Sequence, residues 1–307
     1  MLFSGLCKSN VRRLSKYYLC SMFKNIEKYL SLVKFSHTVF ALPFAAIGYT
    51  LAVTQTGQTF SWPLALKVVL CMVFARSAAM AFNRWADRAI DMKNPRTIVR
   101  EIPSGKISEK AAFAFVIINC VAFIVTTYFI NQACFYLSFV ALAVVLGYSY
   151  TKRFTSLCHL VLGLGLSLAP IGAWIAVTGQ FAVLPLLFSG AVLCWVSGFD
   201  IIYALQDEQF DRSNNLHSIP SLLGTEKALL LSRQLHIATS LFLLSAAFYG
   251  HFNNLYFVGW AVFTGLLIYQ HRLVKPGDLS RVNVAFFTTN GIASITFAVI
   301  VITSLLM

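Results

Sequence analysis

The chain has 307 residues, of which 58% are hydrophobic and only 11% are charged, and its mean hydropathy is +0.73. A soluble globular protein carries about 25% charged residues, and a disordered chain combines low hydrophobicity with high charge, so both classes are excluded. The formal net charge is +13, from 24 Lys and Arg against 11 Asp and Glu. In a chain this apolar, the excess is typical of loops that face anionic lipid, and we expect no nucleic-acid partner. The sequence therefore predicts a polytopic protein of the lipid bilayer.

The first 21 residues form a basic segment without acidic residues. They contain no apolar stretch long enough for a secretory signal peptide. Their composition fits a mitochondrial transit peptide, but we prefer a misassigned start, with Met22 as the true one. Residues 22–307 are predicted to form a single transmembrane domain.

Nine apolar segments follow in chain order, separated by polar breaks. A helix needs about 20 apolar residues to cross a membrane, and the segments are close to that length. They are 35–54, 62–86, 110–130, 133–150, 157–177, 183–204, 227–249, 254–271 and 285–306. The predicted fold class is therefore all-α, a polytopic membrane protein with nine transmembrane helices.

The breaks alternate in charge along the chain. Four of them contain no Lys or Arg: 55–61, 131–132, 178–182 and 250–253. The other four all contain basic residues: 87–109, 151–156, 205–226 and 272–284. Because basic loops favour the cytoplasmic side, we expect these four loops and the N-terminus inside and the C-terminus outside, in a bacterial cytoplasmic membrane.

The chain also contains an internal repeat. Residues 102–111 match residues 219–228, ungapped, in the pattern Ile-Pro-Ser followed by Ser or Thr and then Glu-Lys-Ala. An acidic pair precedes each copy at the end of an apolar segment. Because the offset spans four helices, an even number, the copies run parallel. The nine segments are thus predicted to form two parallel four-helix units plus a final helix.

Each acidic pair belongs to a stripe of residues spaced four apart: Asn83, Asp87 and Asp91 in the first unit, and Tyr203, Asp207 and Asp211 in the second. On a helix, this spacing puts neighbours about 5–6 Å apart on one face, where like charges repel. One interpretation is ion pairing with basic residues of the same loops. The other is a functional site, because ionisable groups at membrane depth are commonly functional.

If the two stripes face one another, their carboxylates converge on one cavity. Mg²⁺ prefers hard oxygen ligands and commonly joins one or two carboxylates to substrate phosphates. The stripes therefore predict a Mg²⁺ site for a lipid diphosphate, with the headgroup at the cytoplasmic rim and the tail among helices. Nearby basic residues are suited to neutralise the remaining phosphate charge: Arg96, Arg100, Lys152 and Arg153.

Three motifs resemble the UbiA superfamily of intramembrane aromatic prenyltransferases, and the resemblance extends from about Ile26 onward. The first signature is matched by NRWADRAID at 83–91 and the second by DIIYALQD at 200–207, and its basic segment by GYSYTKRFT at 147–155. The second signature is most similar to that of the 4-hydroxybenzoate polyprenyltransferase branch. Arg84 departs from the first signature, where many relatives have Asp.

The resemblance implies transfer of a polyprenyl group from a polyprenyl diphosphate to the ring carbon of a hydroxylated aromatic acid in quinone biosynthesis. It implies that Mg²⁺ is held by five residues: Asn83, Asp87, Asp91, Asp207 and Asp211. Arg153, with Lys152, is implied to contact the diphosphate. Asp200, deeper in its segment, is implied to act as a base or an acceptor contact.

Other intramembrane residues complete the predicted site. Ionisation of the diphosphate leaves an allylic cation, which aromatic faces stabilise. The candidates are Tyr148, Tyr150 and Tyr203, and for each of them a role in packing or in anchoring at the membrane interface is the alternative. Arg76 either meets an acceptor carboxylate or pairs with a buried acid such as Asp200. Arg84 is interpreted as an interface anchor whose charged end reaches the membrane surface.

Two alternative functions stay open at this stage. A dihydroxynaphthoate acceptor would place the enzyme in menaquinone biosynthesis. A membrane transporter is the other alternative, because parallel repeats with intramembrane acids also occur in transporters. The position of the acids at the cytoplasmic ends of the segments, and not at the midplane, favours the enzyme.

Overall fold

The computed structural model of the chain describes residues 28–33 and 40–307. The basic segment 1–21 lies outside this range, and so does residue range 35–39 of the first predicted helix. Within the described part, nine long helices correspond to the nine predicted segments. They are α2 (Leu42–Thr56), α3 (Trp62–Ala86), α5 (Glu109–Tyr128), α6 (Gln132–Thr151), α7 (Cys158–Thr178), α8 (Val183–Ala204), α11 (Thr225–Tyr249), α12 (Asn254–Leu273) and α13 (Asn290–Leu306).

Short elements fill two of the basic loops. They are α4 (Arg88–Asp91), the 3₁₀ turn η2 (Leu205–Asp207), α9 (Glu208–Ser213) and α10 (Ile219–Leu223). A π-helical turn, η3 (Val284–Thr289), leads into α13. The acidic stripes thus lie where α3 and α8 end and short helices begin.

Seven helices in the described part are long and apolar enough to cross a membrane, which confirms an all-α, multi-pass membrane fold. The exact number of nine crossings stays a prediction. α2 has 15 described helical residues, and α12 carries Gln270, His271 and Arg272 in its last turn. Large apolar side chains such as Ile118, at 65% exposed, cover the outer surface, as expected where lipid is the solvent.

The polar breaks end the helices by local chemistry. Gly57 and Gly179 adopt left-handed backbone angles, with φ of 66° and 70°, and close α2 and α7. Asn131 begins α6 by accepting a hydrogen bond from the Cys134 N–H at 2.8 Å, and its amide donates to the Ile175 carbonyl at 2.8 Å. One break residue therefore caps its own helix and also joins it to α7.

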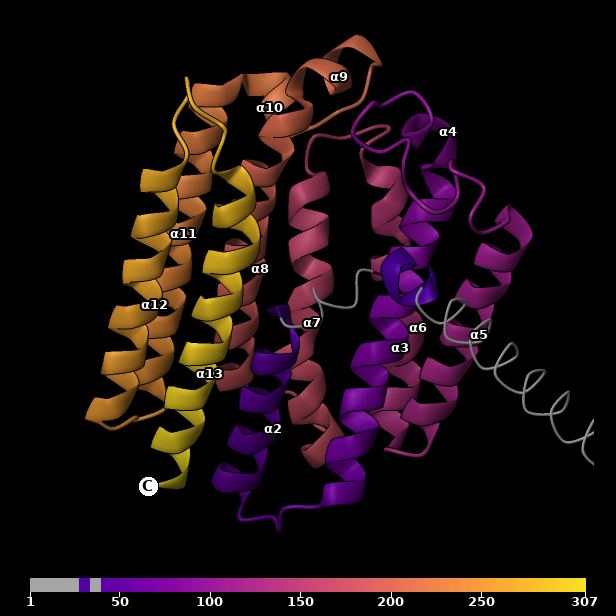
Figure 1. Cartoon of the computed structure of the whole chain (residues 1–307). Coiled ribbons are helices and arrows are strands. Elements are labelled where there is room, and N and C mark those ends of the chain that lie inside the picture. The colour runs from indigo at the N-terminus through magenta and orange to yellow at the C-terminus, as the bar shows by residue number, and fades with distance from the viewer. Residues whose placement is uncertain (1–27, 34–39) are drawn as a thin grey trace, which may run out of the picture.

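The long helices follow one another around a bundle (Figure 1). In chain order, α3 packs against α5 and α6, α6 against α7, α7 against α8, α8 against α11, α11 against α12, and α12 against α13, which returns to α2. α2 also packs against α7 and α8. The short helices α4, α9 and α10 lie together at the upper end of the view, opposite the C-terminus (Figure 1). Both acidic stripes therefore lie at one end of the bundle.

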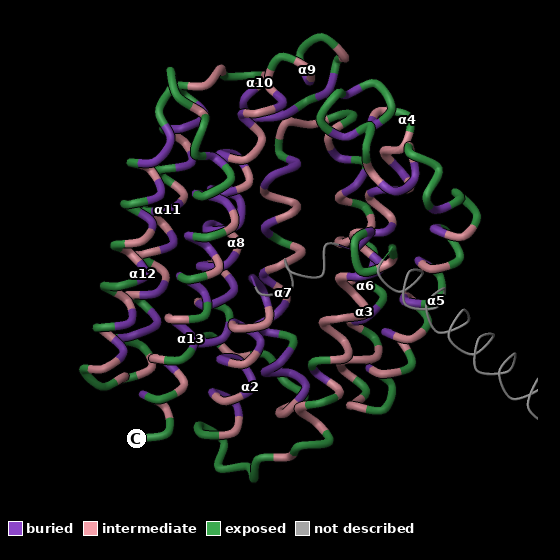
Figure 2. The backbone as a smooth tube through the Cα atoms, in the orientation of Figure 1, coloured by how far each residue is buried: buried purple, intermediate pink, exposed green. Residues whose placement is uncertain are grey.

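The largest apolar core lies among α2, α7, α8, α12 and α13, and the buried positions in Figure 2 follow the inward faces of these helices. Its centre is aromatic. Four ring side chains there are each at most 1% exposed: Phe44, Trp195, Phe263 and Phe297. The Trp195 indole N–H donates to the Asn290 side-chain oxygen at 3.0 Å, so the one polar atom of this ring is satisfied.

α7 and α8 approach each other closely at Gly163. A Cβ atom at this position would lie 2.3 Å from the Ser197 hydroxyl and 2.5 Å from the Leu193 carbonyl oxygen. The Ser197 hydroxyl donates to the His159 carbonyl at 3.1 Å, across the same contact. The glycine therefore sets the spacing that brings His159 of α7 beside Asp200 of α8.

We expect the substitution Gly163→Ala to lower the free energy of unfolding by about 1–3 kcal/mol, because an added methyl group overpacks this contact. Thermal unfolding in detergent micelles would measure the loss. Gly265→Ala in α12, where nothing lies within 4 Å of the added atom, is the matched control and should cause no loss. Equal melting temperatures for the two variants would contradict the proposed role of Gly163.

Candidate active site

A cavity of about 970 Å³ opens among α3, α6, α7 and α8 and the loops that join them. Its upper part is charged, and its lower part runs along an apolar face of α7. Apart from Tyr150, the structure places the residues of the predicted site on its wall: Arg76, Asn83, Asp87, Asp91, Arg96, Arg100, Tyr148, Lys152, Arg153, Asp200, Tyr203, Asp207 and Asp211.

The first acidic stripe keeps its spacing although α3 ends within it. The Asp91 N–H donates to the Asp87 carbonyl at 2.8 Å, so the i to i+4 geometry continues through the break between α3 and α4. The Asn83 amide donates to the Asp87 carboxylate at 3.0 Å. Burial and the neighbouring Asp91 carboxylate raise the pKa of Asp87 above its usual value.

Each carboxylate of this stripe is paired with a basic residue. An Arg153 guanidinium nitrogen lies 3.3 Å from Asp87. Arg100 donates from one nitrogen to both oxygens of Asp91, at 2.7 and 2.9 Å. Asp91 is only 4% exposed, so this pair compensates a carboxylate that has lost most of its contact with water.

The second stripe is paired in the same way. Asp207 accepts hydrogen bonds from the Arg96 Nε and Nη2 atoms and, at 3.2 Å, from the Asn94 amide. Asp211 is fully buried and lies 2.7 Å from the Lys152 ammonium group. The Ser218 hydroxyl donates to the other carboxylate oxygen of Asp211 at 2.9 Å. Both carboxylates therefore contact cations from other segments of the chain.

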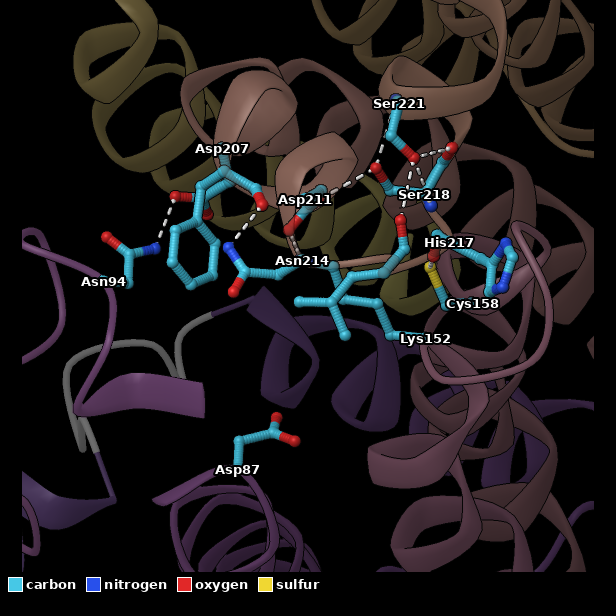
Figure 3. Close-up of polar contacts among 12 residues, drawn as sticks. Asp87, Asn94, Lys152, Cys158, Asp207, Asp211, Asn214, His217, Ser218 and Ser221 are labelled. Atoms are coloured by element: carbon cyan, nitrogen blue, oxygen red, sulfur yellow. Dashed lines mark hydrogen bonds and ion pairs between the residues drawn. The ribbon is translucent and has the colours of Figure 1, made fainter. Parts of the chain in front are cut away.

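These pairs differ from the first interpretation made from the sequence. Of these four pairs, only that of Asp91 and Arg100 lies within one loop, whereas Arg96 of the first unit reaches Asp207 of the second. Figure 3 shows Asp87 across an open space from Asp207 and Asp211, with its carboxylate directed toward them. Asp87 of the first stripe therefore faces the second stripe, which is the condition on which the shared cavity depends.

The carboxylates line one cavity but do not gather around one point. In the described part of the chain, no three His, Cys, Asp or Glu side chains lie close enough to share a metal ion. The donor set, carboxylates and an amide, has the hard-oxygen chemistry that Mg²⁺ prefers. The paired cations are 23% to 40% exposed, so they have room to move off the carboxylates. The residues therefore fit Mg²⁺ by chemistry and by freedom to rearrange.

Two arginines of α3 also line the cavity, Arg76 in its deeper part and Arg84 at the charged end. The Nε atom of Arg76 is buried and has no hydrogen-bond partner among residues 28–33 and 40–307. Asp200 pairs instead with His159, at 2.7 Å, so the predicted alternative of an Arg76–Asp200 pair is wrong. Arg84 is 5% exposed and lines the cavity, so its interpretation as an interface anchor is also wrong. The face of α3 that carries Arg84 turns toward the cavity and not toward the membrane surface.

The three candidate tyrosines differ in whether they line the cavity. Tyr148 and Tyr203 line the cavity, and Tyr203 packs on Phe286 with ring centroids 4.2 Å apart. Tyr150 is 38% exposed and lies outside the cavity wall. Its ring carries the Arg153 guanidinium at 4.9 Å, so it supports that cation from outside. For Tyr150, the structure therefore favours the alternative of a packing role outside the cavity.

Sequence reasoning missed His159 and Asn94, both on the cavity wall. A histidine two residues into an apolar segment is a signal that was available, because ionisable groups at membrane depth are commonly functional. Asn94 gave no such signal, since polar residues are ordinary in a basic loop.

The model of the UbiA prenyltransferase family matches residues 41–292. The 4-hydroxybenzoate octaprenyltransferase of Vibrio parahaemolyticus serotype O3:K6 (strain RIMD 2210633) is 28% identical over 260 residues, covering 85% of this chain and 88% of the relative. That of Francisella tularensis subsp. mediasiatica (strain FSC147) is 31% identical over 234 residues, covering 75% and 81%.

Solved structures share the fold. A UbiA homolog from Aeropyrum pernix K1 in its apo form superposes with a TM-score of 0.79 at 31% identity, covering 87% of this chain and 97% of that one. A UbiA homolog from Archaeoglobus fulgidus bound to DMAPP and Mg²⁺ has a TM-score of 0.71 at 20% identity, covering 91% and 99%. At that lower identity the likeness concerns the fold alone.

We expect Lys152→Met to lower the free energy of unfolding by about 1–3 kcal/mol, because it leaves the buried Asp211 carboxylate without its cation. The double variant Lys152→Met/Asp211→Asn should recover most of the loss, since no unpaired charge remains. Arg212→Met, which breaks an exposed pair with Glu208, should change stability by less than about 0.5 kcal/mol. Thermal unfolding in detergent tests all three, and equal losses in the single and double variants would contradict the expectation.

Proposed function

Because this chain belongs to the UbiA prenyltransferase family, we propose that it transfers a polyprenyl group from a polyprenyl diphosphate to a ring carbon of a 4-hydroxybenzoate-like acid, with Mg²⁺, in quinone biosynthesis. Membership of the family makes the chain an aromatic prenyltransferase and sets aside the transporter alternative. The relatives named 4-hydroxybenzoate octaprenyltransferase support the choice of acceptor and of a long prenyl chain.

The observation that carries the proposal is the division of the cavity into a charged end and an apolar length. Four ion pairs surround the upper end. Below them the wall along α7 is formed by apolar and small residues: Leu162, Gly165, Leu166, Ala169, Gly172, Ala173 and Ala176. A polyprenyl diphosphate has the same division, with two charged phosphates and a long hydrocarbon tail.

At the charged end, Asn83, Asp87 and Asp91 with Asp207 and Asp211 would hold Mg²⁺. When bound, Mg²⁺ supplies Lewis-acid stabilisation of the charge that develops on the leaving diphosphate. The carboxylates would then exchange their present basic partners for the metal. Arg96, Arg100, Lys152 and Arg153 would be free to bind phosphate oxygens, for which guanidinium groups are well suited.

The deeper part of the cavity suits the aromatic acceptor. Arg76 offers a buried guanidinium with no hydrogen bond to its Nε atom within the described residues, and a benzoate carboxylate would complete it. Tyr148 and Tyr203 line the cavity here, between the proposed places of the two substrates. In the reaction, the bond from the prenyl carbon to the phosphate oxygen breaks, with its electrons leaving on the diphosphate. The ring carbon then bonds to the allylic cation, which aromatic faces stabilise and a dry cavity protects from water.

The orientation in the membrane follows from charge. The loops that carry α4, α9 and α10 contain the basic residues and lie at one end of the bundle, opposite the C-terminus. We infer that this end faces the cytoplasm, in a bacterial inner membrane.

The reaction is tested with membranes containing the protein, radiolabelled geranyl diphosphate, and either 4-hydroxybenzoate or 1,4-dihydroxynaphthoate, with Mg²⁺ or with EDTA. We expect an EDTA-sensitive product with 4-hydroxybenzoate. Asp87→Asn and Asp211→Asn should each lower kcat/KM about 100-fold, because each removes a carboxylate from the proposed metal site. Asp278→Asn, at an exposed loop position outside the cavity, is the control.

A product with the naphthoate alone would transfer the proposal to menaquinone biosynthesis. Full activity in EDTA, or in both Asn variants, would contradict the Mg²⁺ assignment.

Arg76→Gln should raise the KM for 4-hydroxybenzoate roughly tenfold to hundredfold and leave the KM for geranyl diphosphate within about twofold. The physical reason is that the variant loses the charge that would pair with the acceptor carboxylate. 4-Hydroxybenzamide, which lacks this carboxylate, is the matched control substrate and should be used equally by both proteins. An unchanged KM for 4-hydroxybenzoate would place its carboxylate elsewhere.

A further inference from the structure

His159 stands near the start of α7 with its ring almost enclosed, at 3% exposed. Its two ring nitrogens reach different segments. The Nδ1 atom lies 2.7 Å from an oxygen of Asp200 on α8. The Nε2 atom accepts a hydrogen bond from the Ile219 backbone N–H, at 3.3 Å, where α10 begins. One side chain therefore joins α7, α8 and α10.

The two bonds together specify where the ring proton lies. A backbone N–H can only donate, so the Nε2 atom must present a lone pair to Ile219. The proton of the ring is then on Nδ1 and is donated to Asp200. This tautomer makes both bonds at once, whereas a proton on Nε2 would oppose the Ile219 N–H.

The bond from His159 orients the Asp200 carboxylate. One of its oxygens receives the Nδ1 proton, and Asp200 lines the cavity with 16% of its side chain exposed. No other hydrogen bond or ion pair to Asp200 is made within the described residues. The second oxygen is therefore available to a substrate, and His159 is the group that sets its direction.

The bond to Ile219 extends the same linkage toward the charged end. Ile219 follows Ser218, whose hydroxyl donates to Asp211 at 2.9 Å. Ser218 is fully buried and caps α10 through a reciprocal pair of bonds with Ser221. His159 thus connects the carboxylate beside the acceptor space to the loop that holds a carboxylate of the proposed diphosphate site.

We propose that His159 is a positioning residue that holds Asp200 to accept the proton lost from the prenylated ring carbon. This inference rests on the proposed prenyl transfer. The new carbon–carbon bond leaves a hydrogen on the attacked ring carbon. The electrons of that carbon–hydrogen bond return to the ring, the proton passes to the free oxygen of Asp200, and the diphosphate has already left with its own electron pair. His159 keeps its ring proton throughout.

Two substitutions separate the two bonds of His159. In His159→Asn, the side-chain amide nitrogen takes the place of Nδ1 and still donates to Asp200, but nothing reaches Ile219. In His159→Gln, the longer side chain places its amide oxygen near the former Nε2 position, where it accepts from Ile219 but leaves Asp200 unsupported. His236→Asn is the control, because His236 is equally buried, at 3% exposed, and lies outside the cavity wall.

With geranyl diphosphate and 4-hydroxybenzoate, we expect kcat of His159→Gln to fall roughly tenfold to hundredfold. Misplacing a reacting group such as the Asp200 carboxylate typically slows a reaction by about this factor. kcat of His159→Asn should stay within about threefold of the unmodified protein, as should that of His236→Asn. A merely structural role would lower kcat in proportion to the loss of thermal stability. Equal kcat values for the Asn and Gln variants, or a loss in Asn alone, would overturn the assignment to Asp200.

Binding of radiolabelled geranyl diphosphate in the presence of Mg²⁺ gives a second readout that needs no turnover. His159→Asn should bind it about threefold more weakly than His159→Gln, because only Asn loses the bond to the loop that supports Asp211. Equal binding would overturn the link to that loop. Failure of the unmodified protein to prenylate any acceptor would reject the prenyl transfer and the role of Asp200 with it, while the binding difference would still test the link through Ile219.

Discussion

The site depends on ion pairs that join segments far apart in the chain. Arg96 and Asp207 are 111 residues apart, and Lys152 and Asp211 come from different helical units. A carboxylate buried near membrane depth without such a partner would be strongly destabilised. The pairs therefore draw the loop after α3, the loop after α6 and the short helices after α8 around one opening. They also hold four cations where a diphosphate would need them.

The same pairing explains how such a site can accept a highly charged ligand. Four carboxylates balanced by four basic side chains carry no net charge between them. Mg²⁺ and a diphosphate arriving together would offer each group a new partner of opposite charge, so that few charges would be left unpaired. The partial exposure of the basic side chains gives them the freedom that this exchange requires.

Below the charged rim, helix packing determines the chemistry. Gly163 lets α7 lie close to α8, and this spacing puts His159 within hydrogen-bond distance of Asp200. The face of α3 directs Arg76 inward, to a part of the wall formed mostly by apolar side chains, and directs Arg84 to the charged end. The deeper part of the cavity thus holds the Asp200 carboxylate and the Arg76 guanidinium group in surroundings that exclude most water, where electrostatic interactions are strong.

The sequence by itself determined the features that follow from local pattern. Apolar length predicted the long helices, and the polar breaks predicted where they end. The spacing of the acidic residues predicted two stripes, because helix periodicity relates residues only a few positions apart. Only the tertiary structure decided which cation pairs with each carboxylate, that Arg84 is buried, that Tyr150 faces outward, and that Asp200 belongs with His159. These outcomes depend on the rotation of each helix about its axis and on the path of each loop. Except for Asp91 and Arg100, which are 9 positions apart, the paired residues are 41 to 111 positions apart, a separation at which local spacing carries no information.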